Sequence, residues 1–419
     1  PPPTLQNHFL SAFSVVRHSQ GSSTMGNTLS YIWCKAERVK VVVIGCGVPE
    51  RGMGWYHAKN ILDGDIPSAT LYAVVEPWFL GAGADSEPGK AFAAWKSEVE
   101  ATGTTFHSSV DTVDFGPNVL ALISGRTADN PRLLKTVVDK GCKTVYLEKP
   151  GAPSVAELEE MAKYAADNQT EVFMGYNKNV TKYVTQARAA EARHPGAVTT
   201  FVHNNAYKPE ELAECFERNA EGMCKNMAVH ECALLVTYYG VSMDTIAEVE
   251  FDDEFTSLQT LGKYTDFDKV KFTITTKDGK QVTVQADRCG GSNSQAIVSL
   301  DGEEKFRSQT PDEALEREVA RKQAKFPGYM PYFFLQHDDY LTLKERVCNH
   351  MVSGDRAEGV ADIQVAIETL KVAEFVTQEG MNKYKPGFLR RVVAAVKGSP
   401  AAANKGSQGS LASMEEKKP

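Results

Sequence analysis

The chain has 419 residues, of which 42% are hydrophobic and 24% charged, proportions typical of a globular protein with two or three domains. Its formal net charge of -8 argues against general nucleic-acid binding, because phosphate contacts need clustered Lys and Arg. The eight cysteines form no Cys-x-x-Cys pair, so we expect reduced thiols, no metal site and a cytoplasmic location. We expect no transmembrane segment, because no run of about 20 apolar residues occurs.

Residues 1–36 contain no Asp or Glu and no sustained hydrophobic period, which predicts a flexible extension. One interpretation is an acid-poor segment that targets the chain to an organelle. Another is N-myristoylation of Gly26, because Met25 to Ser30 fits the M-G-x-x-x-[ST] pattern. A single acyl chain would give only weak membrane association. A chance match in a flexible tail is the third interpretation.

A nucleotide-binding type of sheet is predicted after this extension. The β-branched run Val39–Ile44 is typical of a strand buried on both faces of a parallel sheet. A helical stretch near Trp55–Leu62 and a second strand over residues 70–75 complete a βαβ unit. Further predicted strands are Val119–Ile123, Thr144–Leu147 and Glu171–Met174, with helices at Pro131–Lys140 and Val155–Asp167 between them. We therefore predict an α/β fold that starts with a doubly wound Rossmann domain over residues 37–176.

The pattern changes beyond Tyr176, where apolar and polar residues alternate as in antiparallel strands. These predicted strands are Val198–Asn204, Ile246–Phe251, Lys269–Thr275, Gln281–Ala286 and Ala296–Leu300. Asp278-Gly279 predicts a tight hairpin turn between two of them. We expect an α+β domain over residues 177–390 with a large, mostly antiparallel sheet, completed by helices near Tyr332–Arg346 and Ala361–Thr377. Residues 391–419 are predicted to be a flexible tail.

A glycine-rich loop, residues 45–54, follows the first predicted strand directly. Glycines at a strand-to-helix turn let a pyrophosphate approach the amides at the helix N-terminus, although an ordinary glycine-rich turn is the alternative. Residues 48–51 lengthen the loop beyond G-x-G-x-x-G, so we expect the phosphates to follow a different path along it. Glu50 would repel a pyrophosphate and Arg51 would attract it, so Arg51 is the favoured phosphate contact. The predicted cofactor contacts in this loop are Gly45, Gly47, Arg51, Gly52, Met53 and Gly54.

Glu76 is the candidate ribose-binding acid. It ends the second predicted strand about 20 residues after Gly54, where dinucleotide-binding folds carry such an acid. Its carboxylate can accept hydrogen bonds from both ribose hydroxyls but would repel a 2'-phosphate, and residues 77–80 include no Arg or Lys. The sequence therefore favours NAD(H) over NADP(H).

A family resemblance rests on several short motifs in a fixed order. They are the glycine loop, Gly141 before a strand, Glu148-Lys149-Pro150 at its end, Gly175-Tyr176-Asn177, and a helix carrying His230. Over roughly residues 39–377 the chain resembles the Gfo/Idh/MocA oxidoreductases. The resemblance implies hydride transfer between a nicotinamide and a carbinol carbon of a sugar, polyol or related compound. It also implies a homo-oligomer built on the second sheet, and it adds Ser124, Gly125, Glu148 and Lys149 to the cofactor contacts.

Lys149 is either a surface lysine or a cation at the carboxyl end of a strand, where ligands bind. Pro150 favours the second interpretation because it makes the turn rigid. In the family, the matching lysine contacts substrate and cofactor and assists proton transfer. Partial burial could lower its pKa towards the useful range.

His230 and Asn226 stand where the family has D-x-G-x-H. Positions i and i+4 share one helical face, so both side chains are expected to point into one cleft. Without the resemblance, His230 is more often a packing residue; with it, we expect general acid/base catalysis. Asn226 replaces the family's Asp, and an amide neither ionises nor relays a proton. This departure supports an alternative function, a dinucleotide-binding sensor or scaffold with little turnover.

The substrate side also departs from the family pattern. Arg126 either holds a substrate carboxylate or phosphate or forms a surface ion pair. Tyr176, Asn177 and Asn179 are predicted to line the substrate pocket with donors suited to polyols. The substrate itself stays open.

Overall fold

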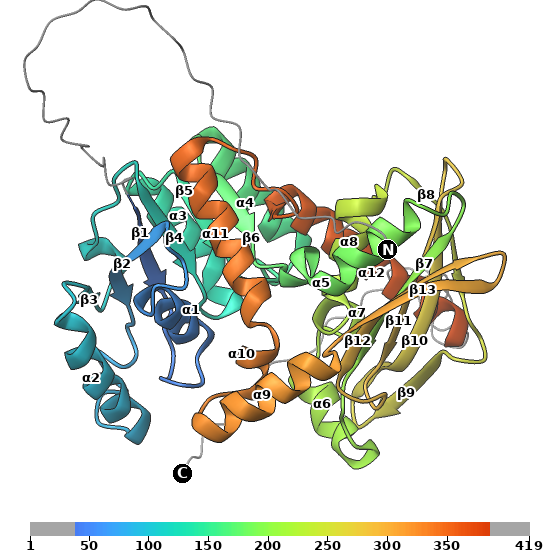
Figure 1. Ribbon diagram of the computed structural model, residues 1–419, viewed down its shortest axis with the longest axis horizontal. Helices are drawn as coiled ribbons and strands as arrows, with labels where there is room; N and C mark the ends of the chain where they lie inside the picture. The colour runs from blue at the N-terminus through green and yellow to red at the C-terminus, as the bar shows by residue number, and fades with distance from the viewer. Residues whose placement is uncertain (1–37, 386–419) are drawn as a thin grey trace, which may run out of the picture. The chain divides into compact units, whose positions relative to one another are not determined.

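The computed structural model describes residues 38–385, which contain two seven-stranded sheets (Figure 1). The first sheet has the order β14-β6-β5-β4-β1-β2-β3. Its strands are β1 (Val39–Ile44), β2 (Ala69–Val75), β3 (Thr105–His107), β4 (Val119–Ile123), β5 (Thr144–Leu147), β6 (Glu171–Met174) and β14 (Ala361–Asp362). All are parallel except β14, which pairs antiparallel with β6. The strand order changes direction between β1 and β4, where ligands bind in such sheets.

The first strand shows why this sheet is doubly wound. Val41 and Val43 pack into a core cluster on one face, and Val42 and Ile44 pack into another cluster on the opposite face. A strand covered on both faces needs the continuous β-branched run found here. The connecting helices are α1 (Met53–Leu62), α2 (Glu87–Glu100), α3 (Asn130–Asp139) and α4 (Val155–Asp167), with short η1 (Val110–Thr112) and η2 (Thr127–Asp129) turns. The predicted Rossmann-type sheet is confirmed.

The second sheet has the order β13-β12-β7-β11-β10-β8, and β9 pairs with β10. Its strands are β7 (Val198–Asn204), β8 (Ile246–Phe251), β9 (Ser257–Leu261), β10 (Tyr264–Thr276), β11 (Gln281–Asp287), β12 (Asn293–Leu300) and β13 (Glu303–Thr310). Pairing is antiparallel except between β7 and β11. The Asp278-Gly279 hairpin joins β10 to β11, and Gly279 has the positive φ of +85° that such turns need. The mostly antiparallel second sheet is thus confirmed.

Helices cover one face of the second sheet. They include α5 (Lys182–Glu191), α8 (Val229–Tyr239) and α12 (Ile363–Tyr384), which share a core cluster with β7, β10, β11 and β12. Helix α12 also packs Ile367 and Leu370 into the core of the first sheet, so one helix joins both cores. The remaining elements here are η3 (Asn177–Val180), η4 (Pro209–Glu211), α6 (Leu212–Arg218), α7 (Met223–Asn226) and α9 (Glu313–Lys325).

The helix expected near Tyr332–Arg346 does not complete the second domain. It is formed by α10 (Pro331–Leu335) and α11 (His337–Ser353), whose apolar side chains pack into the core of the first sheet. Phe333 stacks on Tyr56 of α1 with 4.3 Å between ring centroids, and Tyr56 Oη donates to the Phe333 carbonyl at 2.8 Å. Helix α10 therefore packs on α1 through Phe333, and α11 does so through Tyr340, a long-range pairing that local periodicity does not encode.

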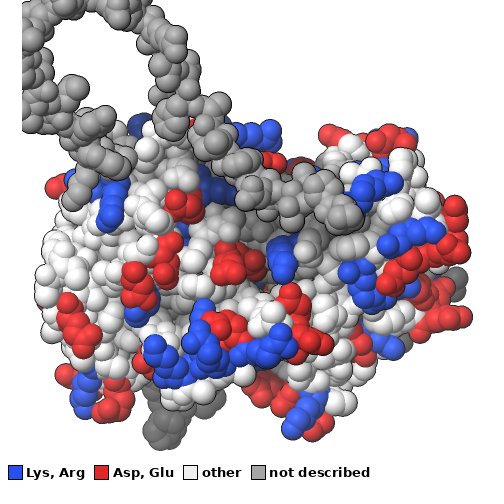
Figure 2. All heavy atoms as spheres, in the orientation of Figure 1, with Lys and Arg blue, Asp and Glu red and all other residues white. Residues whose placement is uncertain are grey.

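The face of the molecule in Figure 2 mixes acidic and basic side chains, with Lys and Arg gathered along α9. None of the helices between residues 38 and 385 is long and apolar enough to cross a membrane. The predictions for residues 1–36, including Gly26 lipidation and organelle targeting, and for the tail at 391–419 fall outside the described residues. They stay predictions, as does the cytoplasmic location.

Candidate active site

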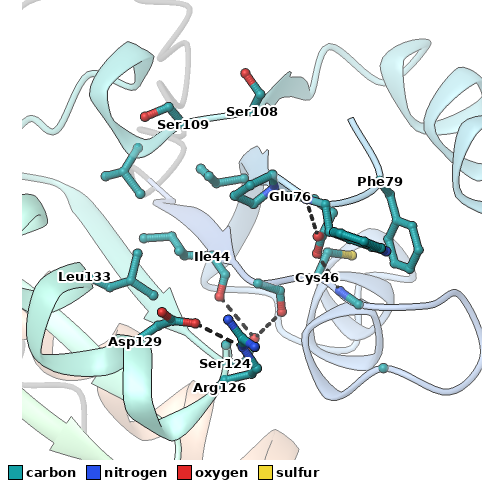
Figure 3. A pocket seen from close by; sticks show the side chains of 18 of the residues that line it. Ile44, Cys46, Glu76, Phe79, Ser108, Ser109, Ser124, Arg126, Asp129 and Leu133 are labelled. Atoms are coloured by element: carbon teal, nitrogen blue, oxygen red, sulfur yellow. Dashed lines mark hydrogen bonds and ion pairs between the residues drawn. The ribbon is translucent and has the colours of Figure 1, made fainter. Parts of the chain in front are cut away.

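A cavity of about 1060 Å³ opens at the carboxyl ends of β1, β2 and β4, where the strand order changes direction (Figure 3). Many of the predicted cofactor contacts meet there. Those that line the cavity are Gly45, Gly47, Gly52, Met53, Glu76, Ser124 and Gly125. Trp78, Phe79, Ser108 and Ser109, which the sequence did not single out, complete much of the wall.

The glycines of the loop sit where no side chain fits. A Cβ on Gly45, whose φ is +82°, would lie 2.6 Å from Gly125 Cα. A Cβ on Gly54 would lie 2.2 Å from the Gly45 carbonyl oxygen and 2.5 Å from Ser124 Oγ. Gly54 therefore does not line the cavity itself but lets α1 close against β1 and β4. This contact directs the N-terminus of α1, at Gly52 and Met53, towards the cavity.

The lengthened part of the loop turns away from the cavity. The amides of Arg51 and Gly52 both donate to the Val48 carbonyl, at 3.1 and 2.6 Å, so residues 48–52 form a closed turn. The Glu50 carbonyl accepts from the Met330 amide at 3.2 Å. Arg51 is exposed and is not part of the cavity wall. Its predicted phosphate contact therefore has no support in this geometry.

Glu76 is fixed at the cavity wall by two backbone amides. Its Oε2 accepts from the Gly47 amide at 2.8 Å and its Oε1 from the Trp78 amide at 3.2 Å. The residue is only 6% exposed. A carboxylate has about four acceptor positions, so two fixed amides leave capacity for ribose hydroxyls.

Arg126 forms the predicted surface ion pair and also borders the cavity, and its contact with a substrate anion stays a prediction. Its Nε lies 3.1 Å from Asp129 Oδ2, which is the surface ion pair drawn in Figure 3. The Arg126 side chain is 88% exposed. Both residues nevertheless line the cavity, together with Arg132. An exposed ion pair of this kind contributes little stability, so Arg126 can leave Asp129 for an anion at low cost.

Lys149 and His230 lie among buried polar side chains rather than in the wall of this cavity. Burial lowers the pKa of Lys149, with Glu148 opposing the shift and Lys178 adding to it. Burial, followed by the charges of Lys149 and Lys178, holds the pKa of His230 well below its usual range. His230 Nδ1 is buried without a hydrogen-bond partner among residues 38–385, and its ring meets Tyr176 edge-on. His230 is therefore a neutral imidazole.

The shared helical face predicted for Asn226 and His230 is wrong. Helix α7 ends at Asn226 and α8 begins at Val229, because the Ala228 amide donates to the Met223 carbonyl, one residue further back than in an α-helix. Asn226 Nδ2 donates instead to Glu221 Oε1 at 2.6 Å. The amide that replaces the family's Asp is thus held by a carboxylate of the preceding turn.

Glu148 lies at the end of a chain of hydrogen bonds that begins at Lys344 and passes through His57. Lys344 Nζ of α11 lies 3.0 Å from His57 Nδ1, and His57 Nε2 lies 2.9 Å from Glu148 Oε1. A carboxylate only accepts, so a neutral His57 donates from Nε2 to Glu148 and accepts at Nδ1 from Lys344. Burial lowers the pKa of Lys344 to about 7 and, with help from Lys344, that of His57 to about 4. Glu148 does not line the cavity, so its role in this structure is to receive this chain of hydrogen bonds.

The three residues predicted to line a substrate pocket are buried in the protein interior. Tyr176, Asn177 and Asn179 are at most 2% exposed. Asn179 Nδ2 donates to Thr237 Oγ1 at 2.9 Å, and the Asn179 carbonyl accepts from Tyr238 Oη at 2.5 Å. These bonds fasten η3 to α8, which argues against a substrate contact by Asn179.

A buried ionic network beside Lys149 and His230 was not predicted. Lys178 Nζ lies 2.5 Å from Glu231 Oε1 and donates to Ser294 Oγ at 3.0 Å. His203 Nδ1 lies 3.0 Å from Glu231 Oε2. Burial raises the pKa of Glu231, but Lys178 and His203 outweigh it and hold that pKa low. The available sequence signals were a lysine in the loop after β6 and an acid beside the motif histidine.

No family profile and no curated protein matches the chain by sequence. Among solved structures, a probable dehydrogenase from Thermotoga maritima is similar, with a TM-score of 0.59, 17% identity, and coverage of 82% of this chain and 97% of its own. The myo-inositol 2-dehydrogenase from Lactobacillus plantarum gives a TM-score of 0.59 at 15% identity, covering 83% and 98%. An oxidoreductase from Agrobacterium radiobacter, in complex with NAD+, L-tartaric acid and magnesium, gives 0.55 at 10% identity, covering 80% and 94%.

These likenesses, at low identity, show the fold. The chain shares its fold with solved inositol dehydrogenases and a probable dehydrogenase, as its motifs predicted.

Proposed function

We propose that the chain is a nicotinamide-dinucleotide-dependent oxidoreductase that acts on a carbinol carbon of a sugar, polyol or related hydroxy compound. The observation that carries the proposal is the cavity at the change in strand order, which joins a glycine-lined helix N-terminus to the anchored acid Glu76. Its volume of about 1060 Å³ suits a ligand of dinucleotide size. The Agrobacterium radiobacter structure with the same fold holds NAD+, which supports the choice of ligand class.

The residues present fit a dinucleotide. The amides of Met53 and Gly54 open α1, and the first amides of a helix have no partner within the helix. They can therefore donate to a pyrophosphate that Gly52 allows to approach. With Arg51 outside the cavity, Arg126 and Arg132 are the cations that remain to balance the phosphate charge.

Glu76 supports NAD(H) over NADP(H) in this proposal. Two backbone amides hold its carboxylate in place, so it cannot swing away from a 2'-phosphate without losing both hydrogen bonds. Two ribose hydroxyls, in contrast, can donate to its remaining acceptor positions.

The bound nicotinamide would accept or return a hydride, and this chain's residues would handle the proton and orient the substrate. Lys149 has a lowered pKa and forms no hydrogen bond or ion pair within residues 38–385, so its ammonium can donate to a substrate oxygen. The family resemblance implies that His230 exchanges the proton of the reacting hydroxyl. Its neutral imidazole is compatible with the role of a base.

Titration of the full chain with NADH and NADPH tests the proposal, followed by a screen of sugars, inositols and hydroxy acids for absorbance change at the nicotinamide band. We expect NADH to bind more tightly than NADPH, and a Glu76→Ser variant to lose most of that difference. Failure of both dinucleotides to bind would overturn the proposal. Assembly through the second sheet stays a prediction, which light scattering of the purified chain checks.

A second candidate function is a dinucleotide-binding sensor or scaffold with little turnover. The observation that favours it is the Asn226 amide, which is bonded to Glu221 and leaves His230 without a carboxylate partner. Tight NADH binding without turnover on the whole panel would favour this candidate over the enzyme.

A further inference from the structure

The group of buried side chains beside Lys149 includes a second histidine, His203, whose hydrogen bonding differs from that of His230. His203 lies on β7, and its Nδ1 is 3.0 Å from Glu231 Oε2. Glu231 is fully buried, and Lys178 Nζ lies 2.5 Å from its other oxygen. A carboxylate that orients an imidazole is the arrangement found in acid/base catalysis. His203 has this arrangement, whereas His230 does not.

The pair fixes which nitrogen of His203 is free. The Glu231 carboxylate is ionised beside Lys178 and can only accept hydrogen bonds. The hydrogen of a neutral His203 ring therefore lies on Nδ1, which leaves a lone pair on Nε2. The side chain keeps 16% of its surface exposed, although Glu231 has none. Nε2 is consequently the basic atom of the ring, which the protein does not enclose completely.

His203 belongs to the same cluster as the motif residues. The charge of Lys149 acts on His203, and His203 in turn acts on His230. Across the sheet, His203 is paired in register with Ser294 of β12, whose hydroxyl accepts from Lys178 at 3.0 Å. By comparison, His230 Nδ1 is buried without a partner among the described residues, and the ring packs against Tyr176. His230 is thus held by packing rather than by a charge.

We propose that His203, oriented by Glu231, is the general acid/base of the reaction, and that His230 shapes the site around the substrate. This inference rests on the function proposed above. In the oxidation direction, the carbinol C–H bond breaks and its hydrogen passes as hydride to the bound NAD+, while the hydroxyl proton passes to His203 Nε2 and a carbonyl forms. Glu231 stabilises the resulting imidazolium, which then releases its proton to solvent. Lys149 donates a hydrogen bond to the reacting oxygen.

The charges around His203 suit a base at neutral pH. Burial lowers its pKa most, Lys178 and Lys149 lower it further, and Glu231 opposes them through charge and hydrogen bond. His230, the other histidine of the cluster, is neutral. Removing the Glu231 charge should therefore lower the pKa of His203 further.

Matched substitutions in the full chain separate the two histidines. We expect His203→Gln to lower kcat by about 100-fold or more, the usual scale of acid/base catalysis, with the NADH dissociation constant within about threefold of wild type. His230→Gln should cost about tenfold or less, and His194→Gln, in the turn after α5, should have no effect. A wild-type kcat in His203→Gln, or a larger loss in His230→Gln, would overturn the inference. A wild type that binds no dinucleotide would instead overturn the proposed function.

Nuclear magnetic resonance of histidine-labelled full chain tests the pair without relying on turnover. His203→Gln identifies the resonances of His203 by their disappearance. The inference expects the Nδ1-protonated tautomer in the wild type, and a lower His203 pKa in Glu231→Gln. An Nε2-protonated tautomer, or an unchanged pKa in Glu231→Gln, would show that Glu231 does not orient His203.

Discussion

Replacing Gly54 with alanine tests how closely α1 must approach the first sheet. The added Cβ would lie 2.2 Å from the Gly45 carbonyl oxygen, 2.5 Å from Ser124 Oγ and 2.8 Å from Cys46 Cα, where ordinary contacts begin near 3.4 Å. Two of these neighbours are backbone atoms, so relief requires α1 to move. Overpacking of this kind costs about 3 kcal/mol, and the better helix propensity of alanine returns about 1 kcal/mol. We therefore expect a net loss of about 2 kcal/mol in the free energy of unfolding.

The same shift should weaken dinucleotide binding, because it moves the amides of Met53 and residue 54 away from the phosphate position. Urea unfolding measures the stability, and NADH titration measures the binding. Gly116→Ala is the matched control, because a Cβ there meets no atom within 4 Å. If Gly54→Ala unfolds like the wild type and binds NADH equally well, the close approach of α1 has no functional importance and the reasoning fails.

Three further predictions concern two buried charges and the amide of Asn226. The pKa of Lys344 is about 7 in the folded chain against an ordinary 10.5, so the unfolded chain binds more protons between these values and stability rises with pH across that window. In urea unfolding at pH 7.5 and 9.5, Lys344→Met should remove a slope of about 1 kcal/mol per pH unit, and an unchanged slope would contradict the assignment. Asn226→Asp should leave kcat unchanged if His203 is the base; a gain of tenfold or more in kcat would return the role to His230. Arg288→Met should cost about 3–5 kcal/mol in unfolding free energy, because it leaves Asp266, 2.6 Å away, as an unpaired buried charge, and a loss below 1 kcal/mol would show the pair to be dispensable.

The parts of the fold with strong local signals could be predicted from the sequence. The β-branched run at Val39–Ile44 and the turn at Asp278-Gly279 each specify their conformation within a few residues, and both occur as expected. Strand β13, Glu303–Thr310, was missed because most of its residues are polar and exposed, and it lies at the sheet edge. Pairings across the fold, such as α11 on α1, leave no local trace.

The candidate site likewise has parts that could be predicted from the sequence and parts that could not. Glycines 45 to 54 and Glu76 follow a local pattern of fixed spacing within one βαβ unit, and the structure brings most of them to one cavity. The prediction that Asn226 and His230 share one helical face was wrong. It assumed an uninterrupted helix, whereas the helix is interrupted at Met227 and Ala228. The bond between Lys344 and His57 joins residues 287 positions apart, and the pair of His203 with Glu231 joins a strand to a helix. Such contacts follow from topology alone.

The central claim is that a nicotinamide dinucleotide binds in the cavity between the glycine loop and Glu76. A crystal structure of the full chain grown with saturating NADH tests it most directly. The account predicts adenosine ribose hydroxyls within hydrogen-bond distance of the Glu76 carboxylate and the pyrophosphate against the amides that open α1. A dinucleotide bound elsewhere, or a cavity that stays empty at saturating NADH, would contradict it.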